Sequence, residues 1–229
     1  MNESKFRHEL KYLISFGQLT ILKQRLSGLI PLDSHVGPAG SYNIRSLYFD
    51  DYDNRCYYEN LAGIGPREKY RIRIYDHNAD RISLECKRKE RGKTQKTSCS
   101  LLKGQCEQLI QGNPLPDLKS QPPVLRKLTM EMLWNRMHPA VIVEYDRIPY
   151  IYKNGNVRIT LDSNIFSSRA FGDFLSDRIP KRPVMPAGQQ LLEVKYDEYL
   201  PDFIYRALQL DSLMQTTYSK YFICRQYTI

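Results

Sequence analysis

Charged and apolar residues alternate along Arg67-Glu68-Lys69-Tyr70-Arg71-Ile72-Arg73-Ile74-Tyr75. Because successive side chains of a β-strand point to opposite faces, this order predicts a strand with a cationic face and an apolar face. The cationic face carries Arg67, Lys69, Arg71 and Arg73, and the apolar face carries Tyr70, Ile72 and Ile74. A half-exposed position, with the cations in water, is the simplest explanation of one such strand. The other strands decide whether that explanation is sufficient.

The same alternation recurs in other segments of the chain. Strands are expected at 5–15, 43–49, 67–76, 81–89, 94–100, 140–147, 157–162 and 191–196. The charged residues that share a face are Glu9 with Lys11, Arg71 with Arg73, Glu85 with Lys87, Arg158 with Asp162, and Glu193 with Lys195. About eight strands, joined mostly by short turns, predict an antiparallel sheet.

Helical periodicity interrupts the strands at several places. Apolar residues three or four apart predict a helix over 16–30, with Ser15 as its N-cap. Shorter helices are expected at 57–61, 102–110 and 124–136, and one or two more in the tail at 202–227. The apolar face of a sheet needs a cover, so these helices are expected to pack on its outside.

Composition limits the classes of partner. The chain has 229 residues, 41% of them hydrophobic, which is enough for one domain spanning residues 1–229. Lysine and arginine outnumber aspartate and glutamate by 34 to 25, and the formal charge is +9. The expected partner is therefore an anion: nucleic acid, an acidic membrane surface or a phosphate compound.

Cysteine usage and hydropathy bear on location. Five scattered cysteines without a CxxC pair argue against a disulfide scaffold and a zinc site, and they favour a cytoplasmic protein. No apolar run approaches the roughly 20 residues that span a bilayer. We therefore expect no membrane insertion by this chain, and any membrane association would need a membrane-anchored partner.

The charged rows must lie on the sheet face that the helices leave uncovered. If about eight strands close into a barrel, that face lines a lumen, where each unpaired cation costs several kcal/mol. Such a lumen requires an anionic ligand, and a few acids among the cations suit a divalent metal bound to phosphates. The expected α+β fold is thus an eight-stranded antiparallel closed barrel with helices outside. A lumen of this width does not admit a nucleic-acid duplex.

Seven short motifs occur in the order found in the VTC domain, which the chain resembles over nearly its whole length. They are Arg7-His8-Glu9-Leu10-Lys11-Tyr12, Tyr48-Phe49-Asp50, Lys69-Tyr70-Arg71-Ile72-Arg73, Glu85-Cys86-Lys87, Tyr145-Asp146-Arg147, Val157-Arg158-Ile159 and Leu192-Glu193-Val194-Lys195. The VTC domain is the polyphosphate polymerase branch of the CYTH-like triphosphate tunnel metalloenzymes. The resemblance implies a tunnel that uses Mn²⁺ or Mg²⁺, transfers the γ-phosphate of ATP to a growing polyphosphate chain and releases ADP.

The resemblance also implies roles for individual residues. Phosphate ligands are expected at Lys11, Arg71, Arg73, Lys87, Lys96, Arg147, Arg158, Lys195 and Lys220. The family's metal ligand falls on Glu193, and Glu9 and Glu85, as the other acids of the charged rows, are also expected to bind metal. From their place on the 67–75 strand, Arg67 and Lys69 are expected at the tunnel rim. From the residues alone, Lys96 and Lys220 could equally be exposed lysines, and Glu193 with Lys195 an ordinary ion pair.

Two positions depart from the family pattern. The wider superfamily has a Glu-x-Glu-x-Lys motif, in which Arg7 replaces the first glutamate here and Glu9 is the acid that remains. In the tail, Thr217 occupies a position where the family has a lysine. The first change disfavours a hydrolase that uses two acids to hold metal and activate water. Two alternatives remain: a tunnel triphosphatase acting on inorganic or nucleoside triphosphate, and a non-catalytic polyphosphate-binding module.

Overall fold

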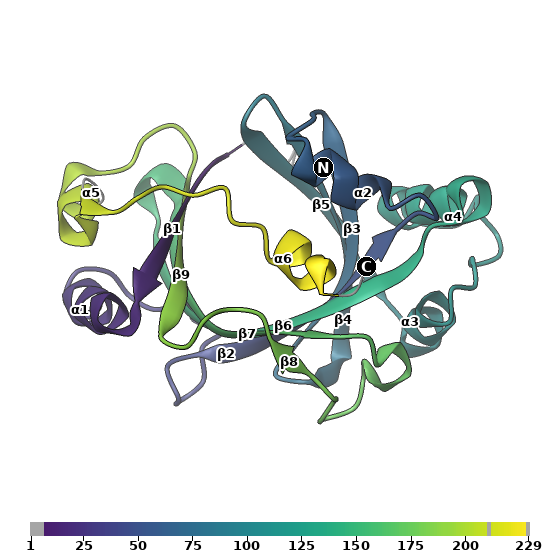
Figure 1. Ribbon diagram of the computed structural model, residues 1–229, viewed down its shortest axis with the longest axis horizontal. Helices are drawn as coiled ribbons and strands as arrows, with labels where there is room; N and C mark the ends of the chain where they lie inside the picture. The colour runs from purple at the N-terminus through teal and green to yellow at the C-terminus, as the bar shows by residue number, and fades with distance from the viewer. Residues whose placement is uncertain (1–6, 210–211, 228–229) are drawn as a thin grey trace.

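The computed structural model describes residues 7–209 and 212–227. Within them, nine antiparallel strands form one curled sheet in the order β1-β9-β7-β6-β2-β3-β4-β5, with the short β8 paired to β7 (Figure 1). The strands are β1 (His8–Ser15), β2 (Tyr42–Asp50), β3 (Arg67–Tyr75), β4 (Asn78–Glu90), β5 (Lys93–Leu101), β6 (His138–Tyr152), β7 (Val157–Ser168), β8 (Arg182–Pro183) and β9 (Gln189–Tyr196). The predicted antiparallel α+β fold is confirmed at this level.

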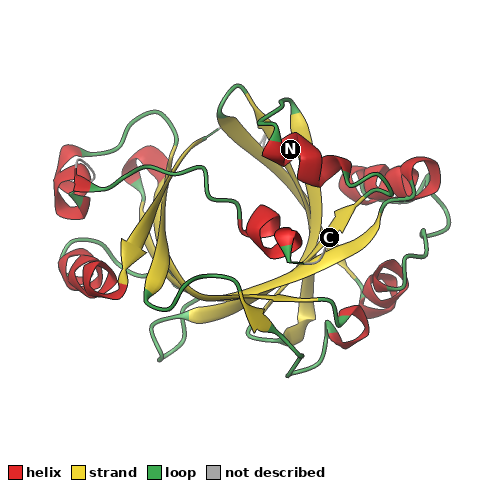
Figure 2. Ribbon diagram, viewed as in Figure 1, coloured by secondary structure: helices red, strands yellow, loops and turns green. Residues whose placement is uncertain are grey.

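Six α-helices accompany the sheet in the described part of the chain (Figure 2). They are α1 (Phe16–Ser27), α2 (Arg55–Leu61), α3 (Lys103–Ile110), α4 (Pro123–Asn135), α5 (Asp202–Leu208) and α6 (Lys220–Gln226). Two short 3-10 turns are η1 (Asn154–Asn156) and η2 (Phe171–Asp173). No described helix is both long enough and apolar enough to cross a lipid bilayer.

The predicted element bounds differ from the observed ones at several ends. β6 and β7 extend beyond the predicted 140–147 and 157–162, because pairs such as Pro149 opposite Thr160 continue the ladder where the apolar alternation stops. Of the predicted first strand, residues 5 and 6 lie outside the described residues. Ser15 caps α1 as predicted, since its hydroxyl oxygen accepts a hydrogen bond from the Gln18 N–H at 3.2 Å.

The prediction of a closed barrel is wrong, because the curled sheet is open along one seam. In the described residues its edge strands β1 and β5 meet at one isolated bridge, where Arg7 and Thr94 exchange backbone hydrogen bonds of 3.1 and 3.3 Å. Farther along β1, the N–H of Thr216 donates to the Lys11 carbonyl at 2.8 Å. The C-terminal segment thus occupies part of the β1 edge that a closed barrel would pair with β5.

The prediction that the helices pack outside the sheet holds for α3, which lies against β4 and β6, and for α4, which lies against β4 and β5, but it is wrong for α6. Figures 1 and 2 show α6 in the hollow of the curled sheet. Its Lys220 forms ion pairs with Asp162 of β7 and Glu193 of β9, and its Tyr221 ring lies 5.2 Å from that of Tyr48. Ion pairs to acids on the concave face and the apolar contacts of Tyr221 and Cys224 together hold this helix inside. The pattern of apolar faces along the sequence does not predict these ion pairs.

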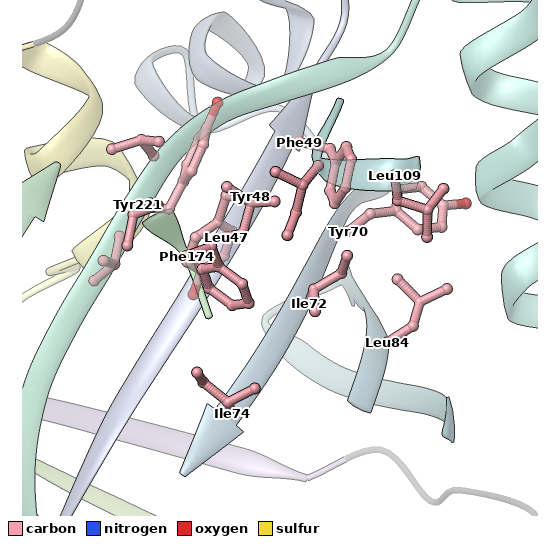
Figure 3. Packing of buried hydrophobic residues seen from close by; sticks show 14 of the residues in the cluster. Leu47, Tyr48, Phe49, Tyr70, Ile72, Ile74, Leu84, Leu109, Phe174 and Tyr221 are labelled. Atoms are coloured by element: carbon pink, nitrogen blue, oxygen red, sulfur yellow. The ribbon is translucent and has the colours of Figure 1, made fainter. Parts of the chain in front are cut away.

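Two apolar clusters fix the orientation of the sheet. In Figure 3, Ile72 of β3 lies near Leu84 of β4, and Ile74 lies farther along β3. These three residues and Leu109 of α3 belong to one cluster, and all four are fully buried. The second cluster joins α1 and α5 to β1, β7 and β9. Because the apolar face of β3 packs in this way, its cationic face points into the hollow.

One buried ion pair anchors the long connection between β7 and β9. Arg45, 1% exposed, donates through Nε to a Glu144 carboxylate oxygen at 2.6 Å. Its other nitrogens donate to the carbonyls of Phe174 at 2.9 Å and Asp177 at 3.2 Å. A charge at this depth is tolerated because its guanidinium hydrogen bonds are satisfied.

Replacing Arg45 with methionine is expected to lower the free energy of unfolding by about 3 kcal/mol, because Glu144 keeps Lys181 but loses its fully buried partner, and the carbonyls of Phe174 and Asp177 lose their donor. Urea denaturation followed by circular dichroism measures this change. Arg55→Met is the matched control, since Arg55 makes a more exposed pair with Glu131 at 2.9 Å. We expect the control to cost less than about 1 kcal/mol. Equal losses in the two variants would contradict the anchoring role of Arg45.

Candidate functional site

A cavity of about 340 Å³ lies in the hollow of the sheet, bounded on one side by residues of the 215–221 segment. Eleven predicted site residues line it: Glu9, Lys11, Arg67, Lys69, Arg71, Arg73, Lys87, Arg147, Glu193, Lys195 and Lys220. They come from β1, β3, β4, β6, β9 and α6. The strand alternation read from the sequence therefore brings together charges that are distant along the chain.

Three predicted site residues do not line this cavity: Glu85, Lys96 and Arg158. Glu85 contacts the Arg71 guanidinium at 2.6 Å, and the Lys96 ammonium, on a side chain that is 53% exposed, lies 2.9 Å from the same carboxylate. Arg158 instead donates to a carboxylate oxygen of Asp33 at 3.1 Å. Glu85 thus contacts the cavity residue Arg71, and Lys96 contacts Glu85. Arg158 has its contact with Asp33, which does not line the cavity.

The two central arginines of β3 are held in place by their neighbours. Arg71 donates through Nε to Glu85 at 2.7 Å and through another nitrogen to the Tyr48 hydroxyl at 2.8 Å. Arg73 donates to the Ser46 hydroxyl at 3.1 Å. Burial by itself would raise the pKa of Glu85, but Arg71 and Arg73 hold that pKa well below its usual range. Glu85 is therefore ionised and fixes the Arg71 guanidinium.

Glu193 is the most heavily surrounded acid of the cavity. It is 5% exposed, and four cations lie within ion-pair distance: Lys195 at 3.0 Å, Lys220 at 3.2 Å, Arg147 at 3.4 Å and Lys11 at 3.5 Å. Burial opposes its ionisation, yet the nearby cations hold its pKa well below the ordinary value. Glu193 is a permanent negative charge among the cations.

Glu9 and Glu193 are the acids among the residues that line the cavity. The Lys11 ammonium lies between them, 3.2 Å from Glu9 and 3.5 Å from Glu193, and Lys87 lies 2.8 Å from Glu9. No group of three or more histidines, cysteines or acids in the described residues is arranged to hold a metal ion. Two carboxylates fit Mg²⁺ or Mn²⁺ that takes its remaining oxygens from phosphate and water, and do not fit an all-protein cage.

Asp162, which the sequence analysis did not select as a site residue, contacts two of the cavity cations without lining the cavity. This carboxylate is fully buried, accepts hydrogen bonds of 2.6 and 2.7 Å from Arg147, and lies 2.6 Å from the Lys220 ammonium. Burial favours its neutral form, but these cations lower its pKa. Its place on the same face of β7 as Arg158 was the available signal. Asp162 orients Arg147 and connects α6 to the sheet.

The two departures from the family pattern occupy different places. The Arg7 guanidinium is outside the cavity lining and lies 2.9 Å from a carboxylate oxygen of Asp197. Thr217 does line the cavity, at the position where a lysine was expected. The Arg7 substitution therefore removes an acid from the Glu9 region without adding a cation to the cavity.

Two cavity lysines have low pKa values. Burial lowers the pKa of Lys69 to about 7, and repulsion from Arg67 and Lys87 contributes. Its ammonium donates to the Asn60 side-chain oxygen and lies 4.7 Å from the centre of the Tyr221 ring. Burial also lowers the pKa of Lys195, to about 8, although Glu193 partly opposes the shift. These lysines change charge near neutral pH, whereas the arginines do not.

Binding of inorganic triphosphate at pH 8 is expected to take up as much as about one proton at Lys69, because a bound anion raises the pKa of a lysine that is mostly neutral at this pH. At pH 6 Lys69 is already protonated, so this uptake disappears. Calorimetry in buffers of different ionisation enthalpy measures it. Lys69→Met should reduce the uptake, whereas Lys23→Met, an exposed position on α1, should not. Equal uptake by Lys69→Met and the original chain would contradict the assignment.

Solved structures share this architecture. A candidate adenylyl cyclase from Hippeastrum with a dominant triphosphatase activity has a TM-score of 0.56 at 15% identity, covering 98% of this chain and 97% of that chain. A candidate adenylate cyclase from Bacillus halodurans has a TM-score of 0.53 at 16% identity, covering 95% of each chain. The PH1819 protein from Pyrococcus horikoshii has a TM-score of 0.50 at 13% identity, covering 96% and 99%. These likenesses establish the common fold.

Sequence comparison identifies the family. No curated protein matched the chain. The model of the VTC domain matches residues 6–229, nearly the whole chain. All the residues that line the cavity fall within this range. The chain therefore belongs to the VTC domain family.

Proposed function

We propose that the protein is an ATP-dependent polyphosphate polymerase, within the broader class of triphosphate tunnel enzymes. The observation that carries this proposal is the composition of the cavity, which ten lysines and arginines and two glutamates line. At an effective dielectric constant near 20, one charge pair at 4 Å contributes about 4 kcal/mol. A chain of phosphates is an anion that can neutralise many of these cations together.

The proposed reaction needs positioning and charge neutralisation more than a covalent nucleophile. A terminal oxygen of the polyphosphate chain attacks the γ-phosphorus of ATP. At the same time, the bond between this phosphorus and the oxygen that bridges the β- and γ-phosphates breaks. ADP leaves with the electron pair of that bond. Arg71 and Arg73 hold phosphate oxygens with oriented N–H groups, and Lys11, Lys87 and Lys220 act as point charges.

A divalent cation, Mn²⁺ or Mg²⁺, would neutralise phosphate charge when bound. Glu193 and Glu9, the two acids that line the cavity, would be its protein ligands, and Lys11 between them would contact phosphate. Glu85 was also expected as a ligand, but its contacts with Arg71 and Lys96 favour a role in orienting Arg71. Lys96 and Arg158 remain proposed phosphate ligands near the edges of the site.

A tunnel triphosphatase is the second candidate, favoured by the similar fold of the Hippeastrum protein, which has a dominant triphosphatase activity. Hydrolysis requires a water positioned and activated beside the phosphate. The first acid of the Glu-x-Glu-x-Lys pattern is Arg7 here, and this guanidinium pairs with Asp197 outside the cavity. Polymerisation is therefore the better-supported reaction. A non-catalytic polyphosphate-binding module would retain binding without turnover.

We also propose that the protein acts in the cytoplasm, where ATP is available and where the five free cysteines stay reduced. Four of the five are buried. Nucleic acid is not a proposed partner. Any attachment to a membrane would come from a membrane-anchored partner.

Incubation of the purified protein with ATP and Mn²⁺ is expected to produce ADP in step with long phosphate chains. Arg73→Ala should lower this rate by at least about a hundredfold, because it removes a preorganised donor to the transferring phosphate. Gel analysis of the chains and an ADP assay measure both products. Arg88→Ala is the matched control, since Arg88 is an exposed β4 residue that pairs with Glu90. Orthophosphate as the sole phosphate product would support the triphosphatase instead.

Glu193→Gln is expected to weaken the effect of Mn²⁺ on triphosphate affinity, because it removes a metal ligand. Without metal, the same variant should bind triphosphate at least as tightly as the original chain, because a negative charge beside the anion is gone. Calorimetric titrations with and without Mn²⁺ separate the two effects. An unchanged enhancement by Mn²⁺ would exclude Glu193 as a metal ligand.

A further inference from the structure

Arg158 belongs to a second cluster on the concave face. In the sheet register it lies opposite Lys195, which lines the cavity, so the two side chains share a face. The Arg158 guanidinium turns away from the cavity and donates to Asp33 at 3.1 Å and to the Tyr42 hydroxyl at 2.8 Å. Its Nε atom is buried and has no hydrogen-bond partner. Arg158 is therefore a cation beside the site whose hydrogen bonds are directed elsewhere.

This cluster lies at the opposite end of the hollow from the predicted rim. The ring of Tyr42 contacts that of Tyr75 at 5.5 Å, and Tyr75 ends β3, the strand that begins at Arg67. Eight residues of extended strand separate these two ends by about 26 Å. The Arg158 side chain is 35% exposed, so this end is open to solvent.

Cations continue from the cavity to this second end. Arg73 lies over the Tyr75 ring at 5.9 Å, and Tyr42 is paired with Arg147 between β2 and β6. Arg158 is the next cation beyond Arg147 and Tyr42. The cavity volume of about 340 Å³ is at the low end of ordinary ligand sites, which span about 300–1,000 Å³. A long phosphate chain must extend out of it, and this row provides a cationic path.

We propose that Asp33 and Tyr42 form a latch on Arg158 that determines whether a phosphate chain can extend past Arg147, which makes Asp33 a specificity-determining residue for chain length. The inference rests on the proposed binding of phosphate chains. The side chain of Asp33 is 7% exposed and competes with phosphate for the guanidinium. A short anion that ends in the cavity does not meet this competition, whereas a long chain must displace Asp33 from Arg158.

The charge of Asp33 can be removed with little change of shape. Its other carboxylate oxygen accepts the His35 N–H at 3.1 Å and contacts the His35 ring at 2.8 Å. An asparagine side-chain oxygen can accept the same backbone hydrogen bond. Asp33→Asn therefore weakens the latch and preserves the turn.

The test compares the affinities of inorganic triphosphate and long-chain inorganic polyphosphate, measured by calorimetry without ATP. Asp33→Asn is expected to tighten long-chain binding by about two- to fivefold, the worth of a partly exposed ion pair, and to leave triphosphate affinity unchanged. Asp76→Asn is the matched control, because it removes a carboxylate that follows Tyr75 and accepts the Asn43 N–H. It should shift the affinities of both ligands equally.

A second variant protects the test from a folding defect. Tyr42→Phe keeps the ring but removes the hydroxyl oxygen that accepts from Arg158, and it should also favour long chains selectively. Equal shifts for both ligands in Asp33→Asn, or no shift in either variant, would overturn the latch. If the original chain makes no polyphosphate but both variants gain affinity for long chains, the latch stands and the polymerase proposal fails. If the chain does make polyphosphate and the variants show no such selectivity, only the latch fails.

Discussion

Compensation of buried charge on the concave face is the constraint on which the rest of the structure depends. Ten cations around one small cavity would repel one another strongly if nothing opposed them. Glu9, Glu85, Asp162 and Glu193 oppose them, and each contacts at least two cations. Four acids offset only part of the charge of ten cations, so the hollow keeps an excess of positive charge that an anionic ligand can neutralise.

This compensation explains why the sheet need not close as a barrel. Asp162 and Glu193 bind Lys220, which holds α6 in the hollow. In the segment before α6, the N–H of Thr216 donates a hydrogen bond to the Lys11 carbonyl at the edge of β1. In a continuous barrel, pairing between edge strands would close the cavity. Here ion pairs that hold the C-terminal segment close part of it. The C-terminal portion of the wall is therefore held by the ion pairs of Lys220 together with the apolar contacts of Tyr221 and Cys224, and the ion pairs make its stability sensitive to the charge state of the cavity.

The sequence predicted the features that depend on neighbours along one strand. Alternation in β3 placed Arg71 and Arg73 in the cavity because their apolar partners Ile72 and Ile74 are fully buried on the other face. It could not place α6, because the pairing of Lys220 with Asp162 joins residues 58 positions apart and no local period encodes it. The contact between Arg158 and Asp33 was not predicted for the same reason. A strand pattern predicts the sheet face on which a side chain lies, but it does not predict the residue that its guanidinium contacts.

The basic residues on the cationic face of β3 differ in their partners and in their pKa values, although one alternating pattern places them all on that face. Arg71 has Glu85 and the Tyr48 hydroxyl as fixed partners, and its charge is permanent. Lys69, two residues earlier on the same face, has no acid among its hydrogen-bond partners in the described structure and is surrounded by other cations. Burial without a counter-charge lowers the pKa of a lysine, while burial beside a carboxylate preserves the charge of an arginine. Alternation therefore decides only which residues enter the cavity, and the acids contributed by other strands decide which of them remain charged as pH rises and which lose their charge.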